Sequence, residues 1–140
     1  MYRLEGMVTL VVDASILLAV LMSEPERPKI VELTIDVDLI AAASVHWEVG
    51  NALSSMLKRG RLTLGQAERV LKNYEKIPIR FVEVSLHEAI RISADRKIYA
   101  YDAFLIACAR DQRCRLISLD RALLQASMDS GIQVVEVPNK

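Results

Sequence analysis

The sequence has few of the residues that define several common classes of protein. Its 140 residues include two cysteines, Cys108 and Cys114, which form no CxxC or other metal-binding spacing. There are only five glycines and four prolines, and they gather in no linker. We therefore expect a single domain over residues 1–140, with residues 1–7 as a short lead-in. Basic and acidic residues number 18 each, which argues against a protein that coats nucleic acid by bulk charge.

Long apolar runs are also missing. The most apolar N-terminal stretch, residues 8–22, is interrupted by Asp13 and Ser15, so it is too short and too broken for a membrane span or a secretion signal. We therefore expect a cytoplasmic protein without membrane contact. Cys108 lies in the apolar run AFLIACA, where a small buried hydrophobic residue is expected.

The arrangement of hydrophobic residues predicts an α/β fold. Short β-branched runs alternate with longer segments of helical period, as in domains with a mainly parallel sheet. Alanine makes one strand weaker than the rest, and one helix is apolar on all sides and should be buried. The strand weakened by alanine is 38–44, and the helix that is apolar on all sides is 103–109. The expected strands are 8–12, 38–44, 79–84, 115–119 and 132–137. The expected helices are 15–22, one after Pro25, 45–59, 63–76, 85–97, 103–109 and 121–128.

Several of these helices carry specific end signals. Thr63 with Gln66, and Ser85 with Glu88, form the pattern of a capping box, in which a hydroxyl and a side chain three residues later satisfy free N–H groups. Gly60 follows the helix 45–59 at a position where a left-handed backbone is tolerated. The signals predict where three helices begin or end.

Four acidic residues occupy comparable places on these elements. Asp13 and Asp120 directly follow the first and fourth strands. Asp102 stands at the start of the buried helix, and Glu48 lies in the first turn of the helix 45–59, beside its apolar stripe. Because the carboxyl ends of parallel strands meet at one edge, where ligands bind, the four side chains can share one crevice.

Such a crevice favours a metal ion. Two carboxylates about 4 Å apart repel by about 4 kcal/mol at an effective dielectric near 20. Their pKa values must therefore rise unless a cation neutralises them. Oxygen ligands without His or Cys select hard ions, here Mg²⁺ or Mn²⁺, which activate water and polarise phosphates.

Each acid also has a purely structural interpretation. Asp13, Asp102 and Asp120 stand where aspartate is favoured as a helix N-cap, and for any one of them alone capping is the more common role. Glu48 alone is typical of a solvated helix surface. Position and spacing therefore suggest a metal site without establishing one.

The segments around the acids resemble a known family. VVDASILLAVL, HWEVGNALSSML, YDAFLIACA and LISLDRALL are similar, in this order, to the four acidic signatures of PIN-domain ribonucleases, and most similar to the VapC-type toxins of prokaryotic toxin–antitoxin pairs. The similarity spans nearly the whole chain. It implies a three-layer α/β/α fold with a parallel sheet of four or five strands in the order 3-2-1-4-5. The switch point then lies between the strands that end at Asp13 and Asp120.

The resemblance also implies an activity, the cleavage of RNA by a Mg²⁺- or Mn²⁺-dependent endoribonuclease. Asp13, Glu48 and Asp102 carry over as metal ligands, and Asp120 as a more variable fourth ligand, direct or through water. The expected partners are the RNA substrate, a small antitoxin protein and a second copy of the chain, which pairs through the helices around residues 25–76.

Three further residues have expected supporting roles. Ser15 resembles a family hydroxyl that supports the first aspartate or a bound water, and Ser118 matches a small hydroxyl residue two places before the fourth acid. For both serines a structural role at a helix start or strand end is an equal alternative. Arg121, next to Asp120, is placed to contact RNA.

Other conspicuous residues receive structural interpretations. His46 and His87 have no partner at metal-ligand spacing, so surface or packing roles are expected. For Trp47, packing under a neighbouring helix or at a subunit contact is favoured over stacking on a base. The densest basic cluster is typical of a solvated helix end, and a contact with phosphate is the alternative. Its members are Lys58, Arg59 and Arg61.

Two other functions stay open. One is a Mg²⁺-dependent phosphotransfer domain that uses Asp13, although VVDAS lacks a second aspartate two residues on. A phosphorylated Asp13 would support it. The other is a non-catalytic PIN-like domain that binds RNA or protein, which weak metal binding without RNA cleavage would support.

Overall fold

The computed structural model describes residues 6–138, in which five parallel strands and seven helices form three layers. The sheet has the order β3-β2-β1-β4-β5, and every neighbouring pair is parallel. The strands are β1 (Thr9–Val12), β2 (Asp38–Ala42), β3 (Ile79–Val82), β4 (Arg115–Ser118) and β5 (Val134–Glu136). The helices are α1 (Ala14–Leu21), α2 (Arg27–Thr34), α3 (Ser44–Lys58), α4 (Leu64–Glu75), α5 (Leu86–Arg96), α6 (Ala100–Gln112) and α7 (Arg121–Asp129).

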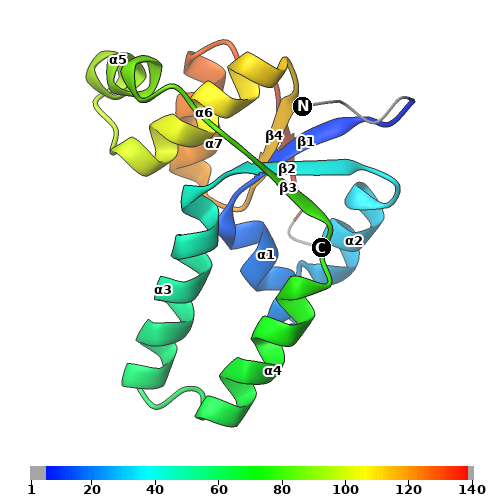
Figure 1. Ribbon diagram of the computed structural model, residues 1–140. Helices are drawn as coiled ribbons and strands as arrows, with labels where there is room; N and C mark the ends of the chain where they lie inside the picture. The colour runs from blue at the N-terminus through cyan, green and yellow to red at the C-terminus, as the bar shows by residue number, and fades with distance from the viewer. Residues whose placement is uncertain (1–5, 139–140) are drawn as a thin grey trace.

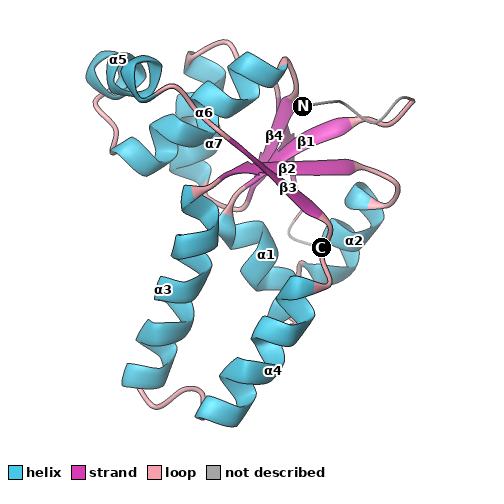
Figure 2. Cartoon of the chain, viewed as in Figure 1, coloured by secondary structure: helices cyan, strands magenta, loops and turns pink. Residues whose placement is uncertain are grey.

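Helices cover both faces of the sheet. The connections from β1 to β3 run in one direction across the sheet and carry α1 to α4, which lie on one face. The connections from β3 to β5 run the other way and carry α5 to α7, which lie on the opposite face (Figures 1 and 2). Right-handed crossovers require this division. The direction reverses between β1 and β4, so the predicted fold, strand order and switch point are confirmed.

The core lies where α6 crosses the central strands. All four residues of β1 are buried, as expected of a parallel strand covered on both faces. On α6, Ala103 and residues 105–109 are buried, which confirms the predicted buried helix. Cys108 is among them, and burial, with nearby Cys114 and Asp111, raises the pKa of its thiol to about 12, so it acts as a small apolar residue.

The predicted helix ends are present. In the capping box before α4, Gln66 N donates to Thr63 Oγ1 at 3.2 Å and Thr63 N donates to Gln66 Oε1 at 2.9 Å. Glu88 N donates to Ser85 Oγ at 3.2 Å, and Gly60 has a φ of +71°. All five strands are shorter than predicted. β1 and β4 each lose one residue, β2 ends at Ala42 because α3 begins at Ser44, β3 ends at Val82, and β5 covers only Val134–Glu136.

Two further features frame the site. The α3–α4 hairpin extends well beyond the sheet on one side (Figures 1 and 2). Within residues 6–138 no helix has the length and apolar character that a membrane crossing requires. Of the predicted lead-in, residues 1–5 lie outside the described part of the chain.

Asp38 is an acid with a structural role at the other edge of the sheet. It begins β2, is 4% exposed, and receives Arg80 Nε on Oδ1 at 3.0 Å and Arg80 Nη2 on Oδ2 at 2.6 Å. Thr9 Oγ1 also donates to Oδ2 at 3.2 Å. This bidentate pair ties β1, β2 and β3 together at their amino ends.

Candidate active site

The four predicted acids lie at the carboxyl edge of the sheet. Asp13 directly follows β1, and Asp120 follows β4 after one intervening residue. Asp102 is in the first turn of α6, which crosses the sheet above them, and Glu48 is in α3, which starts just after β2. The fold therefore brings together residues that are up to 107 positions apart, between Asp13 and Asp120.

The carboxylates are close enough for their charges to act on one another. Burial raises the pKa of Asp13, with a contribution from the charge of Asp120, and outweighs the hydrogen bonds that lower it. Burial also raises the pKa of Glu48, and the charges of Asp13 and Asp102 raise it further. The pKa of Asp102 is raised by burial and by Asp120 and Asp13. Each acid thus interacts with at least one other, as the shared crevice requires.

Two serines hold the carboxylate of Asp13, which is 6% exposed. Ser15 Oγ donates to Oδ1 at 2.7 Å and Ser118 Oγ donates to Oδ2 at 2.5 Å. Each serine also accepts from the β4–α7 loop: Leu119 N reaches Ser15 Oγ at 3.0 Å, and Asp120 N reaches Ser118 Oγ at 2.9 Å. The two hydroxyls therefore lock the end of β1 to the end of β4.

The N-cap interpretation holds for two of the three aspartates. Asp13 Oδ1 accepts from Ile16 N at 3.2 Å, and Asp120 Oδ1 accepts from Ala122 N at 2.9 Å and from Leu123 N at 3.2 Å. For Asp102 it is wrong, because α6 begins at Ala100 and Asp102 is its third residue. There the N-terminal end of the helix dipole still favours its negative charge.

Glu48 presents an unsatisfied oxygen. It is the fifth residue of α3, beyond the predicted first turn, because the helix begins at Ser44. Its Oε1 is buried and has no hydrogen-bond partner in the structure of residues 6–138. A buried carboxylate oxygen without a partner is costly, and two neighbouring negative charges increase the cost. A cation or a protonated group placed there would remove it.

The set of donors suits a hard divalent ion. All are carboxylate oxygens, which is the ligand type of Mg²⁺ and Mn²⁺, and the orphaned oxygen of Glu48 is the kind of atom that such an ion satisfies. As the side chains stand, no three His, Cys, Asp or Glu residues of the described chain are arranged to hold a metal ion. Closing the set around one ion therefore requires side-chain rotation.

A pocket of about 590 Å³ opens beside Glu48. Residues of α3, Ala14 and Leu18 of α1, and Tyr101 of α6 line it. Trp47 lines it and is 72% exposed, so the expectation that it packs under a neighbouring helix of the chain is wrong, and the alternative of a subunit contact stays a prediction. The sequence reasoning missed Tyr101, although it directly precedes Asp102.

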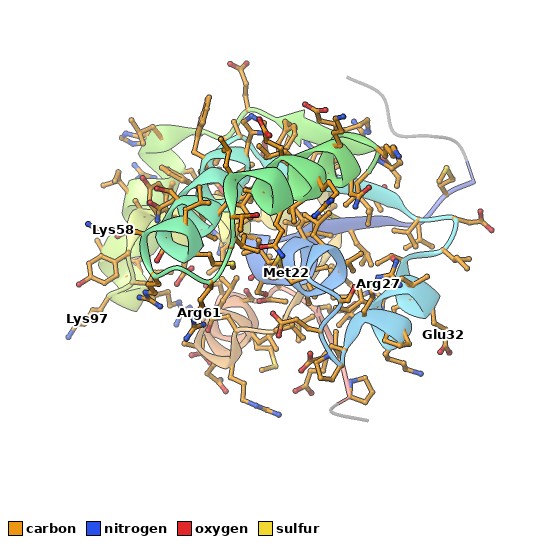
Figure 3. The ribbon with its side chains drawn as sticks, turned by 90° about the horizontal axis from the view of Figure 1, so that it is seen from below. Met22, Arg27, Glu32, Lys58, Arg61 and Lys97 are labelled. Carbon is orange, nitrogen blue, oxygen red and sulfur yellow. The ribbon has the colours of Figure 1, made fainter. Side chains whose placement is uncertain are left out.

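The side chains of Arg121 and His46 contact groups other than the four acids. Arg121 is exposed and its Nη1 lies 3.7 Å from Glu136 Oε1, so it points toward β5. His46 Nδ1 lies 2.9 Å from Tyr74 Oη and joins α3 to α4, in agreement with a packing role. The basic cluster is exposed at the tip of the hairpin, where Figure 3 shows Lys58 and Arg61 extending in different directions.

A parallel sheet covered by helices on both faces, with four interacting acids at its switch point, defines an α/β/α domain of the kind that binds ligands at that edge. The chain belongs to the PIN domain family, whose model matches residues 10–127, from β1 through most of α7. Proteins of this family are typically nucleases.

Solved structures share the whole architecture. The crystal structure of PAE2754 from Pyrobaculum aerophilum is 25% identical and has a TM-score of 0.71, with 93% of this chain and 91% of that chain covered. A toxin–antitoxin complex from Klebsiella pneumoniae is 17% identical, with a TM-score of 0.63 and 90% and 95% covered. VapBC2 from Rickettsia felis, bound to a DNA fragment from its promoter, is 10% identical, with a TM-score of 0.67 and 94% and 100% covered. A comparison with curated proteins gives no match.

Proposed function

We propose that this protein is a Mg²⁺- or Mn²⁺-dependent endoribonuclease and the toxin of a type II toxin–antitoxin pair. The observation that carries the proposal is the set of four interacting carboxylates at the switch point of a PIN domain, one of them with an orphaned buried oxygen. A bound cation would allow these acids to stay ionised together at neutral pH.

The acids and the serines have different roles at the proposed metal site. Asp13, Glu48 and Asp102 would hold the ion, which when bound polarises the scissile phosphate and lowers the pKa of a bound water. Ser15 and Ser118 fix the carboxylate of Asp13 and favour its ionised form, because both donate to it. Asp120 uses Oδ1 to cap α7, so it contributes charge at the site from a fixed position and supports a ligand or water from its other oxygen.

The proposed reaction is hydrolysis. Water adds across the bond between phosphorus and the 3′ oxygen: the hydroxide joins phosphorus and the proton goes to the leaving oxygen. The products then carry a 5′-phosphate and a 3′-hydroxyl. A reaction that used the ribose 2′-hydroxyl as nucleophile would instead leave a 2′,3′-cyclic phosphate.

The decisive experiment is cleavage of total RNA in Mn²⁺ or Mg²⁺ with analysis of the new ends. Asp102→Asn should reduce cleavage at least 100-fold while circular dichroism stays unchanged. Asp111→Asn is the matched control, because Asp111 lies on the same helix but is exposed near its other end. Cleavage that persists in EDTA, or products with cyclic ends, would contradict the proposal.

The toxin assignment and the partners rest on a different observation. Two of the similar structures are a toxin–antitoxin complex and VapBC2 with promoter DNA. Expression of the chain should arrest growth, Asp13→Asn should not, and co-expression of the small protein encoded next to it should restore growth. Self-association is supported by exposed apolar side chains on α2, α3 and α4 and is testable by sedimentation equilibrium. These are Val31, Leu57, Leu64 and Leu71.

The phosphotransfer alternative finds no support in the geometry of Asp13. A nucleophilic carboxylate needs a free and accessible oxygen. Both oxygens of Asp13 accept hydrogen bonds from serines, and the residue is 6% exposed.

A further inference from the structure

We propose that Trp47 and Tyr101, which line the pocket beside Glu48, are specificity-determining residues on whose rings an unpaired base next to the scissile phosphate stacks. The inference rests on the proposed function, since it assigns residues that hold the substrate beside the same acids.

The pocket shares Glu48 with the four acids and is lined by neighbours of two others. Glu48 belongs to both, and Ala14 and Tyr101, which line the pocket, directly adjoin Asp13 and Asp102 in the chain. A phosphate held at the acids therefore has its neighbouring nucleotide at the mouth of the pocket. At about 590 Å³ the space is large enough for a nucleobase.

Two aromatic rings face solvent on separate helices of this pocket. Trp47 is 72% exposed and Tyr101 is 58% exposed, although both are large and largely apolar. The Trp47 ring stands edge-on to His46, with centroids 4.9 Å apart and planes at 75°, and His46 is held in turn by Tyr74. The indole is thus oriented before any ligand arrives. Stacking of a base on such a ring is worth about 1–3 kcal/mol.

Polar groups in the same lining favour a base over a protein side chain. Ser44 Oγ is buried without a hydrogen-bond partner in the described chain, and Ser44 lines the pocket. Asn51 adds an amide, which both donates and accepts. A heteroaromatic base offers ring faces to stack and polar edges to pair with these atoms. An apolar side chain of a protein partner would leave the polar atoms unsatisfied.

The pocket also discriminates between forms of RNA. In a duplex, the bases are stacked inside and the deep major groove keeps side chains from their edges. A base can stack on Trp47 or Tyr101 only when it is unpaired. The basic cluster at the end of α3 lies about 16 Å from Trp47 along the helix, at 1.5 Å per residue, and offers phosphate contacts for the rest of the strand.

Fluorescence provides a direct test, because Trp47 is the only tryptophan in the chain. The inactive Asp13→Asn protein is titrated in Mg²⁺ with a single-stranded RNA oligonucleotide, and separately with the duplex of the same sequence. Stacking on Trp47 should quench its emission with the single strand, and at least tenfold more duplex should be needed for the same effect.

Variants separate stacking from general affinity. With fluorescently labelled RNA, Tyr101→Leu and Trp47→Leu should each weaken binding about tenfold, and Trp47→Phe should largely restore it. Tyr99→Leu is the matched control and should change affinity less than twofold. Tyr99 is 89% exposed and precedes the same helix, but it does not line the pocket.

Each outcome decides between the alternatives. Equal quenching by duplex and single strand, or no greater loss for Tyr101→Leu than for Tyr99→Leu, would overturn the inference. Cleavage of RNA by the wild-type protein without quenching in the inactive protein would leave the proposed function standing and remove this one. Quenching by a purified antitoxin but by no RNA would assign the pocket to a protein and overturn the inference as well.

Discussion

Replacement of Ser118 by alanine tests how the site is held together. Ser118 Oγ donates to Asp13 Oδ2 at 2.5 Å and accepts from Asp120 N at 2.9 Å. Loss of a hydrogen bond to a charged group costs about 1.5–3 kcal/mol, and the backbone N–H left without its partner costs about 1 kcal/mol. We expect the free energy of unfolding to fall by about 3 kcal/mol. At about 3 °C per kcal/mol, the Tm falls by about 9 °C.

The loss should depend on pH. The Ser118 hydroxyl favours the ionised form of Asp13, so its stabilisation is full where Asp13 is ionised in the folded protein. It is partly lost as the pH falls through the pKa of Asp13. Burial raises that pKa above its ordinary value of 3.8, so the decline begins at a higher pH than for an exposed aspartate. The difference between the variant and the wild type should therefore be larger at pH 8 than at pH 4.5.

Urea denaturation at the two pH values measures both effects, with far-ultraviolet circular dichroism as the signal. Ser127→Ala is the matched control. Ser127 is also fully buried, but its Oγ donates to the Leu123 carbonyl within α7 at 2.7 Å, a neutral bond worth about 1 kcal/mol. A loss below 1 kcal/mol for Ser118→Ala, or equal losses at both pH values, would refute the idea that this hydroxyl holds an ionised Asp13.

Three further predictions address the acids and the sheet. Asp13→Asn should raise the free energy of unfolding of the metal-free protein at pH 7.5 by about 1 kcal/mol. The reason is that burial disfavours the charged carboxylate, and a carboxyl whose pKa is raised in the folded protein destabilises the fold as the pH rises through that pKa. An equal or lower thermal midpoint in EDTA would count against this. Binding of Mg²⁺ should release protons and tighten as the pH rises, because the pKa values of Asp13, Glu48 and Asp102 are raised; calorimetry in buffers of different ionisation enthalpy measures the protons, and a buffer-independent enthalpy would contradict the prediction. Arg80→Ala should destabilise the fold by about 3 kcal/mol by leaving the Asp38 carboxylate without its bidentate partner; cleavage by the protein that remains folded should be unchanged, and a selective loss of cleavage would show that this pair acts on the site.

The sequence predicts the fold and the general position of the site because those depend on local rules. The positions of Asp13 and Asp120 follow from where the first and fourth strands end. The helices α3 and α6 follow from the spacing of their apolar residues. The order of the strands came from the resemblance of four short segments to PIN domains. The capping pattern at Thr63 was specific because both of its hydrogen bonds lie within one turn of helix.

The errors concern features that depend on packing between distant segments. The start of α6 was misplaced because its N-cap, Tyr99, makes no side-chain capping bond. The exposure of Trp47 depends on how α3 lies against α1, which no local pattern encodes. The pair of Asp38 and Arg80 joins residues 42 positions apart on adjacent strands. The orphaned oxygens of Ser44 and Glu48 likewise follow from burial by other segments.

The two serine bridges also bear on when the site exists during synthesis of the protein. Ser118 and Leu119, which fasten the end of β4 to Asp13 and Ser15, follow more than 100 residues after their partners. A nascent chain that has completed β1, β2 and β3 still lacks the whole α6–β4–α7 half of the crevice. Such a chain has neither Asp102 nor Asp120, and Asp13 lacks its hydrogen bond from Ser118. The chain must therefore be synthesised as far as Asp120 before the four acids can assemble, and under the proposed function no cleavage precedes that point.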